Sequence, residues 1–186
     1  MTVKNSPKNT IEVTDENTME NSIIILLILV ACLSRLIPHL PNFTAVGAMA
    51  LFAGAKIGSK RLALFVPLAA MLLSDLFLGF HSTMIFVYGA IALAALIGHW
   101  GWKRWQWKGL VGLSLFSSLL FFVITNFGVW LTGGYEQSWQ GLSTCFTLAI
   151  PFFSHQVVGD LLFTGVIFGF YAVIQALSRR FMAPTI

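Results

Sequence analysis

The sequence predicts an all-α integral membrane protein, a bundle of six transmembrane helices with both termini in the cytoplasm. Three observations lead to this fold class. Hydrophobic residues make up 57% of the chain and charged residues only 10%. A soluble domain carries about 25% charged residues, so this composition is typical of a protein dissolved in lipid. The other two observations are a series of long apolar runs and the position of the basic residues between them.

Six apolar runs provide the candidate spans. They lie at about 22–37, 43–57, 62–80, 83–100, 110–131 and 151–177. A helix needs roughly 20 residues to cross the hydrocarbon core, with about 17 as the lower limit, and the last four runs meet this easily. The second run is short, so its length alone leaves it open as a span or a re-entrant hairpin. Residues 1–21 are expected to form a disordered cytoplasmic tail, and residues 181–186 a second cytoplasmic tail.

The basic residues decide how the second run is interpreted. If all six runs cross and the N-terminus is inside, every Lys and Arg except Arg35 lies on the inner side, as the positive-inside rule requires. A re-entrant second run would move Lys56, Lys60 and Arg61 outside, so we predict six spans. The same clustering accounts for the net charge of +4 without a nucleic-acid partner. Residues 135–150 become an outer loop that lies on the membrane or folds back over the bundle.

Polar side chains gather in the outer half of this topology. Asp75 and Asp160 should face the bundle interior, because a charged side chain in hydrocarbon costs about 2.5–3.5 kcal/mol on insertion scales. Arg35 is the one basic residue on the outer side. An alternative is that it forms an ion pair with one of the two aspartates and that this pair only fixes helix packing. Taken together, the polar residues of this half predict a ligand pocket open to the outside. The candidate substrate-binding residues are Arg35, Asp75, His81, Tyr88, Asn126, Trp130, His155 and Asp160.

The second run carries a different signal, because small residues fill most of it. Small side chains let helices approach closely and pack through backbone contacts. They favour either tight packing within this bundle or a smooth face for a partner membrane protein. The candidate packing residues are Ala45, Gly47, Ala48, Ala50, Ala53 and Gly54.

Motifs of known enzyme chemistry are absent from the sequence. There is no HExxH helix, no GxSxG elbow and no P-loop, so we expect no catalytic residue, no cofactor and no transport driven by this chain's own nucleotide hydrolysis. The spacing of His81, His155, Asp75 and Asp160 does not support a metal site. An intramembrane enzyme built from these four groups is kept as an alternative hypothesis.

Four segments resemble an uncharacterised family of bacterial six-span membrane proteins. They are PNFTAVGAMALFAGA (Pro41–Ala55), SDLFLGFHSTMIFVYG (Ser74–Gly89), NFGVWL (Asn126–Leu131) and GLSTCFTLAIPFF (Gly141–Phe153). The resemblance covers about Arg35 to Asp160 and implies a multi-pass protein of the bacterial inner membrane. That family is in turn similar, more distantly, to the substrate-binding S components of energy-coupling factor transporters.

The similarity to S components implies a role in uptake. It implies a pocket for a vitamin or a related micronutrient in the outer half of the bundle, capped by outer loops. It also implies that an Ala-rich helix contacts a transmembrane coupling subunit, which two ATPases drive. The expected partners are therefore the lipid bilayer, a small-molecule ligand and these subunits. An accessory or scaffold subunit of a membrane complex, without a ligand of its own, is the alternative.

Overall fold

All regular structure in the described part of the chain is helical. The structure is a computed structural model, and it describes Ser22, Leu26, residues 29–31 and residues 33–181. Within these residues there are helices, turns and bends but no strand. The predicted tails, 1–21 and 181–186, lie outside the described residues except for Phe181, which ends the last helix. The all-α prediction is confirmed for the part that the structure describes.

The helices follow one another with short connections. After a first helix whose described residues end at Leu36, the elements are α2 (Val46–Lys56), α3 (Lys60–Leu78), α4 (Met84–Trp105), the 3₁₀ turn η1 (Gln106–Gly109), α5 (Leu110–Val129), the π turn η2 (Trp130–Gly134) and α6 (Trp139–Phe181). Among the described residues, three helical stretches are long and apolar enough to cross a membrane. They are Lys60–Leu78, Met84–Gly134, which contains α4 and α5, and Trp139–Leu177.

The outside of the bundle is apolar where a soluble protein would be polar. Large apolar side chains that are more than half exposed occur on each of the helices from α3 to α6. They include Phe65, Phe77, Ile85, Val111, Val166 and Phe170. A soluble monomer rarely exposes contiguous apolar patches of this kind, whereas lipid tails cover them readily. The long apolar helices and this exterior together indicate a membrane protein.

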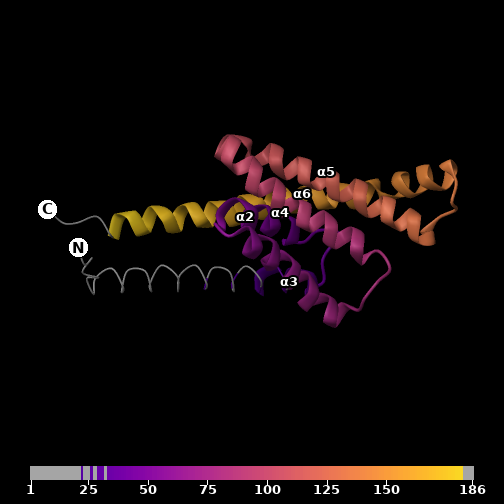
Figure 1. Ribbon diagram of the computed structural model, residues 1–186, viewed down its shortest axis with the longest axis horizontal. Coiled ribbons are helices and arrows are strands. Elements are labelled where there is room, and N and C mark those ends of the chain that lie inside the picture. Colours follow the sequence, from indigo (N-terminus) through magenta and orange to yellow (C-terminus); the bar gives the residue numbers. More distant parts are fainter. Residues whose placement is uncertain (1–21, 23–25, 27–28, 32, 182–186) are drawn as a thin grey trace, which may run out of the picture.

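The bundle has two chemically different ends. Figure 1 shows the α4–α5 connection and the C-terminal part of α6 at one end, and the Gly79–Thr83 loop and the Tyr135–Ser138 connection at the other. We call the second end the loop end. The first is the basic end, and its basic residues are Lys56, Lys60, Arg61, Lys103, Arg104 and Lys108. Of the basic side chains that the structure describes, only Arg35 lies toward the loop end.

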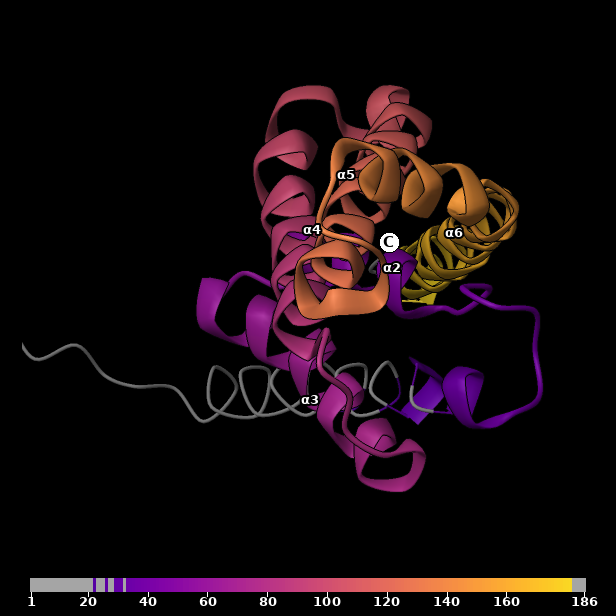
Figure 2. The ribbon, with the colours of Figure 1, turned by 90° about the vertical axis from the view of Figure 1, so that its right-hand side faces the viewer.

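α2 lies in the middle of the bundle and packs on its neighbours through small residues. In the end-on view of Figure 2 it lies between α4 and α6, and its residues from Ala48 to Gly54 are all buried. A Cβ atom at Gly54 would lie 1.8 Å from the carbonyl oxygen of Ala95, and one at Gly98 would lie 2.1 Å from that of Leu51. The backbones of α2 and α4 are therefore in contact, which requires glycine at both positions.

α2 is short for a transmembrane helix. It has 11 residues, which rise about 16 Å and so cover roughly half of the hydrocarbon core. The sequence predicts a span over 43–57, but the helix begins only at Val46, after a turn and irregular residues. Asn42 and Thr44 in that irregular segment line a cavity. Irregular backbone is tolerated at membrane depth where it borders a cavity of this kind.

α6 differs from the prediction at its N-terminal side. The sequence predicts an outer loop over 135–150 and a span that begins at Pro151, but the helix begins at Trp139 and continues through the proline. The Ser138 hydroxyl accepts a hydrogen bond from the Gly141 backbone N–H at 3.1 Å, which caps the first turn. A proline removes one backbone hydrogen bond, and a membrane helix tolerates this when neighbouring groups satisfy the freed carbonyl. The loop prediction is wrong because Pro151 lies within α6 and does not start it.

At the basic end, three aromatic rings surround the ammonium group of Lys56. Its Nζ lies 3.7 Å from the centre of the Trp102 ring, 4.6 Å from that of Tyr171 and 5.3 Å from that of Trp107. Cation–π contacts are effective within about 6 Å of a ring centre. We call Trp102, Trp107 and Tyr171 the aromatic box. Because these rings come from α4, η1 and α6, one lysine ties the end of α2 to three other elements.

Candidate functional site

Arg35 and Asp75 form a buried ion pair toward the loop end. Arg35 Nη2 lies 2.6 Å from Asp75 Oδ1, and the two side chains are 16% and 0% exposed. This approach is an ion pair, and Asp75 Oδ1 has no hydrogen-bond partner among the described residues. A single charge in a membrane interior costs about 2.5–3.5 kcal/mol on insertion scales, and pairing offsets much of that cost. The pair therefore lets both residues lie inside the bundle.

Neutral groups complete the surroundings of this pair. Arg35 Nη1 donates a hydrogen bond to the Ser74 hydroxyl at 2.8 Å and lies 2.9 Å from the sulfur of Met71. The Tyr88 hydroxyl donates to Asp75 Oδ2 at 2.8 Å. Both oxygens of Asp75 thus have partners within the chain. Because Tyr88 belongs to α4, the pair holds the first helix, α3 and α4 together.

Asp160 lies in a second buried cluster, between α5 and α6. Its Oδ2 accepts hydrogen bonds from the Ser118 hydroxyl at 2.7 Å and from the Gln156 amide at 3.5 Å. The same amide also donates to the Ser118 carbonyl at 3.3 Å. Asp160 is 7% exposed. Among the described residues, no Lys, Arg or His nitrogen lies within ion-pair distance of it, so only neutral donors hold this carboxyl group.

The second oxygen of Asp160 is directed toward α2. A Cβ atom at Gly47 would lie 2.4 Å from Asp160 Oδ1, so the carboxyl group occupies space that any side chain at position 47 would fill. Within the described part of the chain, Oδ1 accepts no hydrogen bond. The absence of a side chain at Gly47 therefore makes room for the carboxyl group of Asp160, in addition to allowing close helix packing.

A cavity of about 310 Å³ lies beside both clusters. Arg35 reaches it from the first helix, and Gln156 and Asp160 reach it from α6. Exposed residues of the loop end form its rim, namely His39, Asn42, Leu78 and His81. Its remaining walls include Val46, Gly47, Ile91, Ala94, Ser117 and Phe121. A concave, mainly apolar site of this size with a few polar groups is typical of a small-molecule pocket.

Comparison with known proteins gives one match. A family model matches residues 15–183, a range that contains every residue of the cavity. The chain belongs to the DUF6580 family. This is a family of unknown function, so membership in it assigns no ligand and no activity. No curated protein and no solved structure matches the chain.

In this DUF6580 protein, three of the eight predicted site residues line the cavity and two more lie behind one of them. Arg35, His81 and Asp160 line it. Asp75 and Tyr88 lie behind Arg35 and reach the cavity only through that side chain. His81 is exposed at the rim, where its Nδ1 lies 2.8 Å from the hydroxyl of the nearby Thr83. The cavity therefore joins residues from the first helix, the α3–α4 loop and α6.

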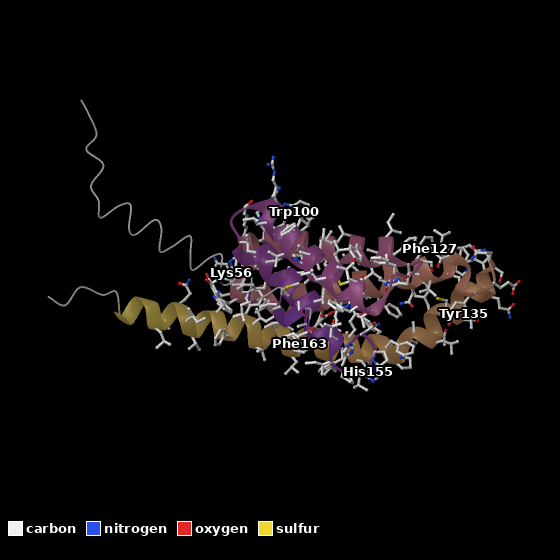
Figure 3. The ribbon with its side chains drawn as sticks, turned by 90° about the horizontal axis from the view of Figure 1, so that it is seen from below. Lys56, Trp100, Phe127, Tyr135, His155 and Phe163 are labelled. Atoms are coloured by element: carbon white, nitrogen blue, oxygen red, sulfur yellow. The ribbon has the colours of Figure 1, made fainter. Side chains whose placement is uncertain are left out.

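Asn126, Trp130 and His155 do not line the cavity. The Asn126 side chain donates to the Phe122 carbonyl at 2.7 Å, and the Trp130 indole donates to the Glu136 carbonyl at 3.0 Å. Both contacts stabilise the C-terminal end of α5 and the connection that follows it. His155 Nδ1 is buried without a hydrogen-bond partner, and Figure 3 shows this residue on α6, between the two ends of the bundle.

All the candidate packing residues of the second run except Gly47 are buried inside this DUF6580 chain. Ala45, Ala48, Ala50 and Ala53 are at most 1% exposed. Gly54 is also buried. Gly47 is half-buried beneath Asp160, and α2 as a whole contacts each helix from α3 to α6. In the described chain, this geometry favours packing within the bundle over a face that is free for a partner.

Gln156 and Ser118 are site residues that the predicted set lacks. Gln156 precedes Asp160 by four residues, and residues at that spacing share one face of a helix. Spacing is therefore a signal that identifies Gln156. Ser118 offers no comparable signal, because serines in membrane helices commonly bond to a carbonyl of their own helix. Its hydroxyl in fact lies within bonding distance of both the Ser114 carbonyl, at 3.0 Å, and Asp160.

The groups around the cavity are suited to holding and orienting a small molecule. They comprise the guanidinium group of Arg35, the carboxyl group of Asp160, two amides, two imidazoles, two hydroxyls and apolar walls. Within the described residues, no three His, Cys, Asp or Glu side chains stand close enough to hold a metal ion together. A few convergent polar groups in an otherwise apolar pocket are the usual basis of orientation and specificity.

Proposed function

We propose that this protein binds a small molecule, such as a vitamin or a related micronutrient, and takes part in its uptake. The observation that carries the proposal is the convergence of Arg35 and Asp160 on one cavity inside an apolar bundle. Ionisable groups within a membrane domain are costly and by default mark a substrate or ion pathway. Helix packing alone accounts for the Arg35–Asp75 pair, but it does not account for Asp160, which has no counter-charge among the described residues.

The proposed topology has six spans, with both termini in the cytoplasm of a bacterium and the bundle in its inner membrane. The basic end then faces the cytoplasm, as the positive-inside rule requires. The cavity consequently opens to the outside, where an uptake protein meets its ligand. The short α2 agrees with this arrangement, because water in the cavity mouth reduces the thickness of hydrocarbon that the chain must cross there.

The proposed source of energy is a partner. The sequence has no P-loop, so nucleotide hydrolysis would come from other subunits. The similarity to S components supports a transmembrane coupling subunit driven by two ATPases, and it also motivates the choice of a vitamin as ligand.

Thermal unfolding of the purified protein with a panel of vitamins tests the proposal. A ligand at about 100 times its Kd raises the free energy of unfolding by about 2.7 kcal/mol. Val87 lines the cavity and is half-buried, so Val87→Phe should fill part of the cavity and reduce the shift. Ile85→Phe on the same helix is the matched control, because Ile85 is 77% exposed and lies outside the cavity. A shift that survives Val87→Phe unchanged would place the ligand elsewhere.

A scaffold role is the second candidate, and the length of α6 favours it. Its 43 residues correspond to about 65 Å measured along the helix axis, roughly twice the thickness of the hydrocarbon core. Figure 1 shows its C-terminal part running beyond the other labelled helices. Co-purification separates the two candidates. A stable protein partner together with no ligand in the panel would favour the scaffold, whereas a ligand blocked by Val87→Phe would favour uptake.

A further inference from the structure

Two hydrogen-bond acceptors on one face of α6 lack a donor, and the residues that carry them line the cavity. Gln156 and Asp160 lie four residues apart, both line the cavity, and they are 5% and 7% exposed. Gln156 Oε1 is buried and has no hydrogen-bond partner. Asp160 Oδ1 accepts no hydrogen bond within the described residues either. A buried polar atom without a partner costs about 1–3 kcal/mol, so this face of the cavity favours a ligand that donates hydrogen bonds.

The other polar atoms of these two side chains are already engaged. Gln156 Nε2 donates to the Ser118 carbonyl at 3.3 Å and to Asp160 Oδ2 at 3.5 Å. The Ser118 hydroxyl donates to the same Oδ2 at 2.7 Å. Turning the Gln156 amide over would bring its oxygen against these two acceptors and lose both contacts. The contacts therefore fix Oε1 of Gln156 and Oδ1 of Asp160 as the acceptors that remain free.

The charge of the cavity lining favours a positive ligand. Arg35 is the one basic side chain among the described residues that line it, and Asp75 already neutralises it at 2.6 Å. The two imidazoles of the lining, His39 and His81, stand at the exposed rim and are outside ion-pair distance of Asp160. Asp160 is thus left without a counter-charge. A buried carboxylate gains most from a charge-assisted hydrogen bond.

We infer that the ligand carries a cationic nitrogen with at least two N–H groups, which donate to Asp160 Oδ1 and Gln156 Oε1. Ammonium, amidinium and protonated amino-heterocyclic groups have this chemistry. The inference rests on the proposed function and names the class of its ligand. The cavity volume of about 310 Å³ suits an organic molecule, since a bare metal ion needs far less space. Ile91, Ala94 and Phe121 in the walls would contact the carbon part of the ligand.

The test uses the full-length protein in lipid nanodiscs and four probes of similar size. Benzamidinium is a cation with N–H donors, and benzyltrimethylammonium is a cation without them. Benzyl alcohol is neutral, and benzoate is an anion. Binding is measured by the change in unfolding temperature over a titration of each probe. Benzamidinium should bind about tenfold more tightly than benzyl alcohol, which is the effect of one charge-assisted hydrogen bond, and benzoate should bind least.

Two variants separate charge from hydrogen bonding. Asp160→Asn removes the charge and should weaken the binding of both cations, with the affinity for benzamidinium falling by about tenfold. Gln156→Met removes the free acceptor but keeps a side chain of similar length. It should therefore weaken the binding of benzamidinium and leave that of benzyltrimethylammonium unchanged. Glu136→Gln is the control, because it removes an exposed carboxyl group that does not line the cavity. It should leave the affinities for all four probes unchanged.

Three results would overturn the inference. They are tighter binding of benzoate or benzyl alcohol than of benzamidinium, benzamidinium binding that Asp160→Asn leaves intact, and no binding of any probe. None of these results contradicts the proposed function. That proposal is tested separately, by the vitamin titration with Val87→Phe. If Asp160→Asn does not fold, the order of the four probes and the effect of Gln156→Met still decide the outcome.

Discussion

Arg35 and Asp75 depend on each other because each supplies the other's counter-charge at 2.6 Å. Removing one partner leaves the other charge buried and unpaired, so Asp75→Asn should lower the free energy of unfolding by about 3 kcal/mol. Arg35→Gln should have a similar effect. The double variant should lose clearly less than the sum of the two, because residues in direct contact are not additive. Thermal or denaturant unfolding of the purified protein measures all three, and strictly additive losses would contradict the pairing.

Tyr88 contributes one hydrogen bond to the same carboxylate. Its hydroxyl donates to Asp75 Oδ2 at 2.8 Å, and a hydrogen bond to a charged group contributes about 1.5–3 kcal/mol. Tyr88→Phe should therefore destabilise the protein by about 1.5 kcal/mol, less than Asp75→Asn does. Tyr135→Phe is the control, because the Tyr135 hydroxyl has no hydrogen bond to the described residues. Equal losses in the two variants, measured by the same unfolding assay, would show that the Asp75 contact is not the cause.

The sequence predicts how deep a polar side chain lies in the bundle better than it predicts where the side chain points. Depth follows from the position of a residue along an apolar run. Direction depends on rotation about the helix axis, which changes by about 100° from one residue to the next. Gln156 consequently shares a face with Asp160, four residues away, whereas its neighbour His155 does not line the cavity. Asn126 lies near the C-terminal end of α5, but its amide bonds to a carbonyl of its own helix.

The contact between α2 and α4 rests on backbone approach at two glycines. A Cβ atom at Gly98 would lie 2.1 Å from the Leu51 carbonyl oxygen, so Gly98→Ala forces the two helices apart. We expect a loss of about 2 kcal/mol or more in stability, as overpacking of a rigid core costs about 1–3 kcal/mol.

Gly89 in the same helix provides the matched control for this variant. No atom lies within 4 Å of a Cβ atom placed there, so Gly89→Ala should be neutral or should stabilise α4 by up to about 1 kcal/mol. Unfolding of both variants under identical conditions measures the difference. Similar stabilities for Gly98→Ala and Gly89→Ala would contradict the close contact of α2 and α4.

Helix ends are harder to predict than helix cores. The small residues of the second run predict close helix packing from composition alone, and the structure buries all the candidate packing residues except Gly47. The sequence prediction misses the start of α6, because hydropathy indicates which residues prefer lipid and not which residues are helical. Residues 139–150 contain several polar side chains, yet a helix continues past the lipid boundary as long as its backbone bonds continue. Pro151 resembles a boundary in the sequence and lies inside a helix in the structure.

The distribution of charge over the whole molecule makes a prediction about orientation. Ser59 is exposed at the basic end and Ser82 is exposed in the α3–α4 loop. With Cys32 and Cys145 first replaced by Ala, an impermeant maleimide should label Ser82→Cys in intact right-side-out vesicles. It should label Ser59→Cys only after the membrane is opened. If Ser59→Cys is labelled first, the orientation in the membrane is the opposite of the proposed one. If both variants are labelled in intact vesicles, the protein does not have a single orientation.

The whole bundle also limits what the sequence can predict about the cavity. The charge and hydropathy of the sequence distinguish the two ends of the bundle, because both can be evaluated for each segment separately. The cavity wall combines the first helix, the segment before α2, the α3–α4 loop and the five helices from α2 to α6. Only the packing of all of these decides that Arg35 pairs with Asp75 and not with Asp160. The sequence leaves that choice open because both aspartates lie at suitable depths.

Gly47 and Lys56 stand nine residues apart on α2, one against the carboxyl group of Asp160 and the other among aromatic rings. That distance is about 13 Å along a helix axis. A displacement of α2 at Gly47 would therefore move the Lys56 ammonium group relative to Trp102 and Trp107 at the basic end. Indole emission responds to nearby charge, so tryptophan fluorescence would detect such a displacement.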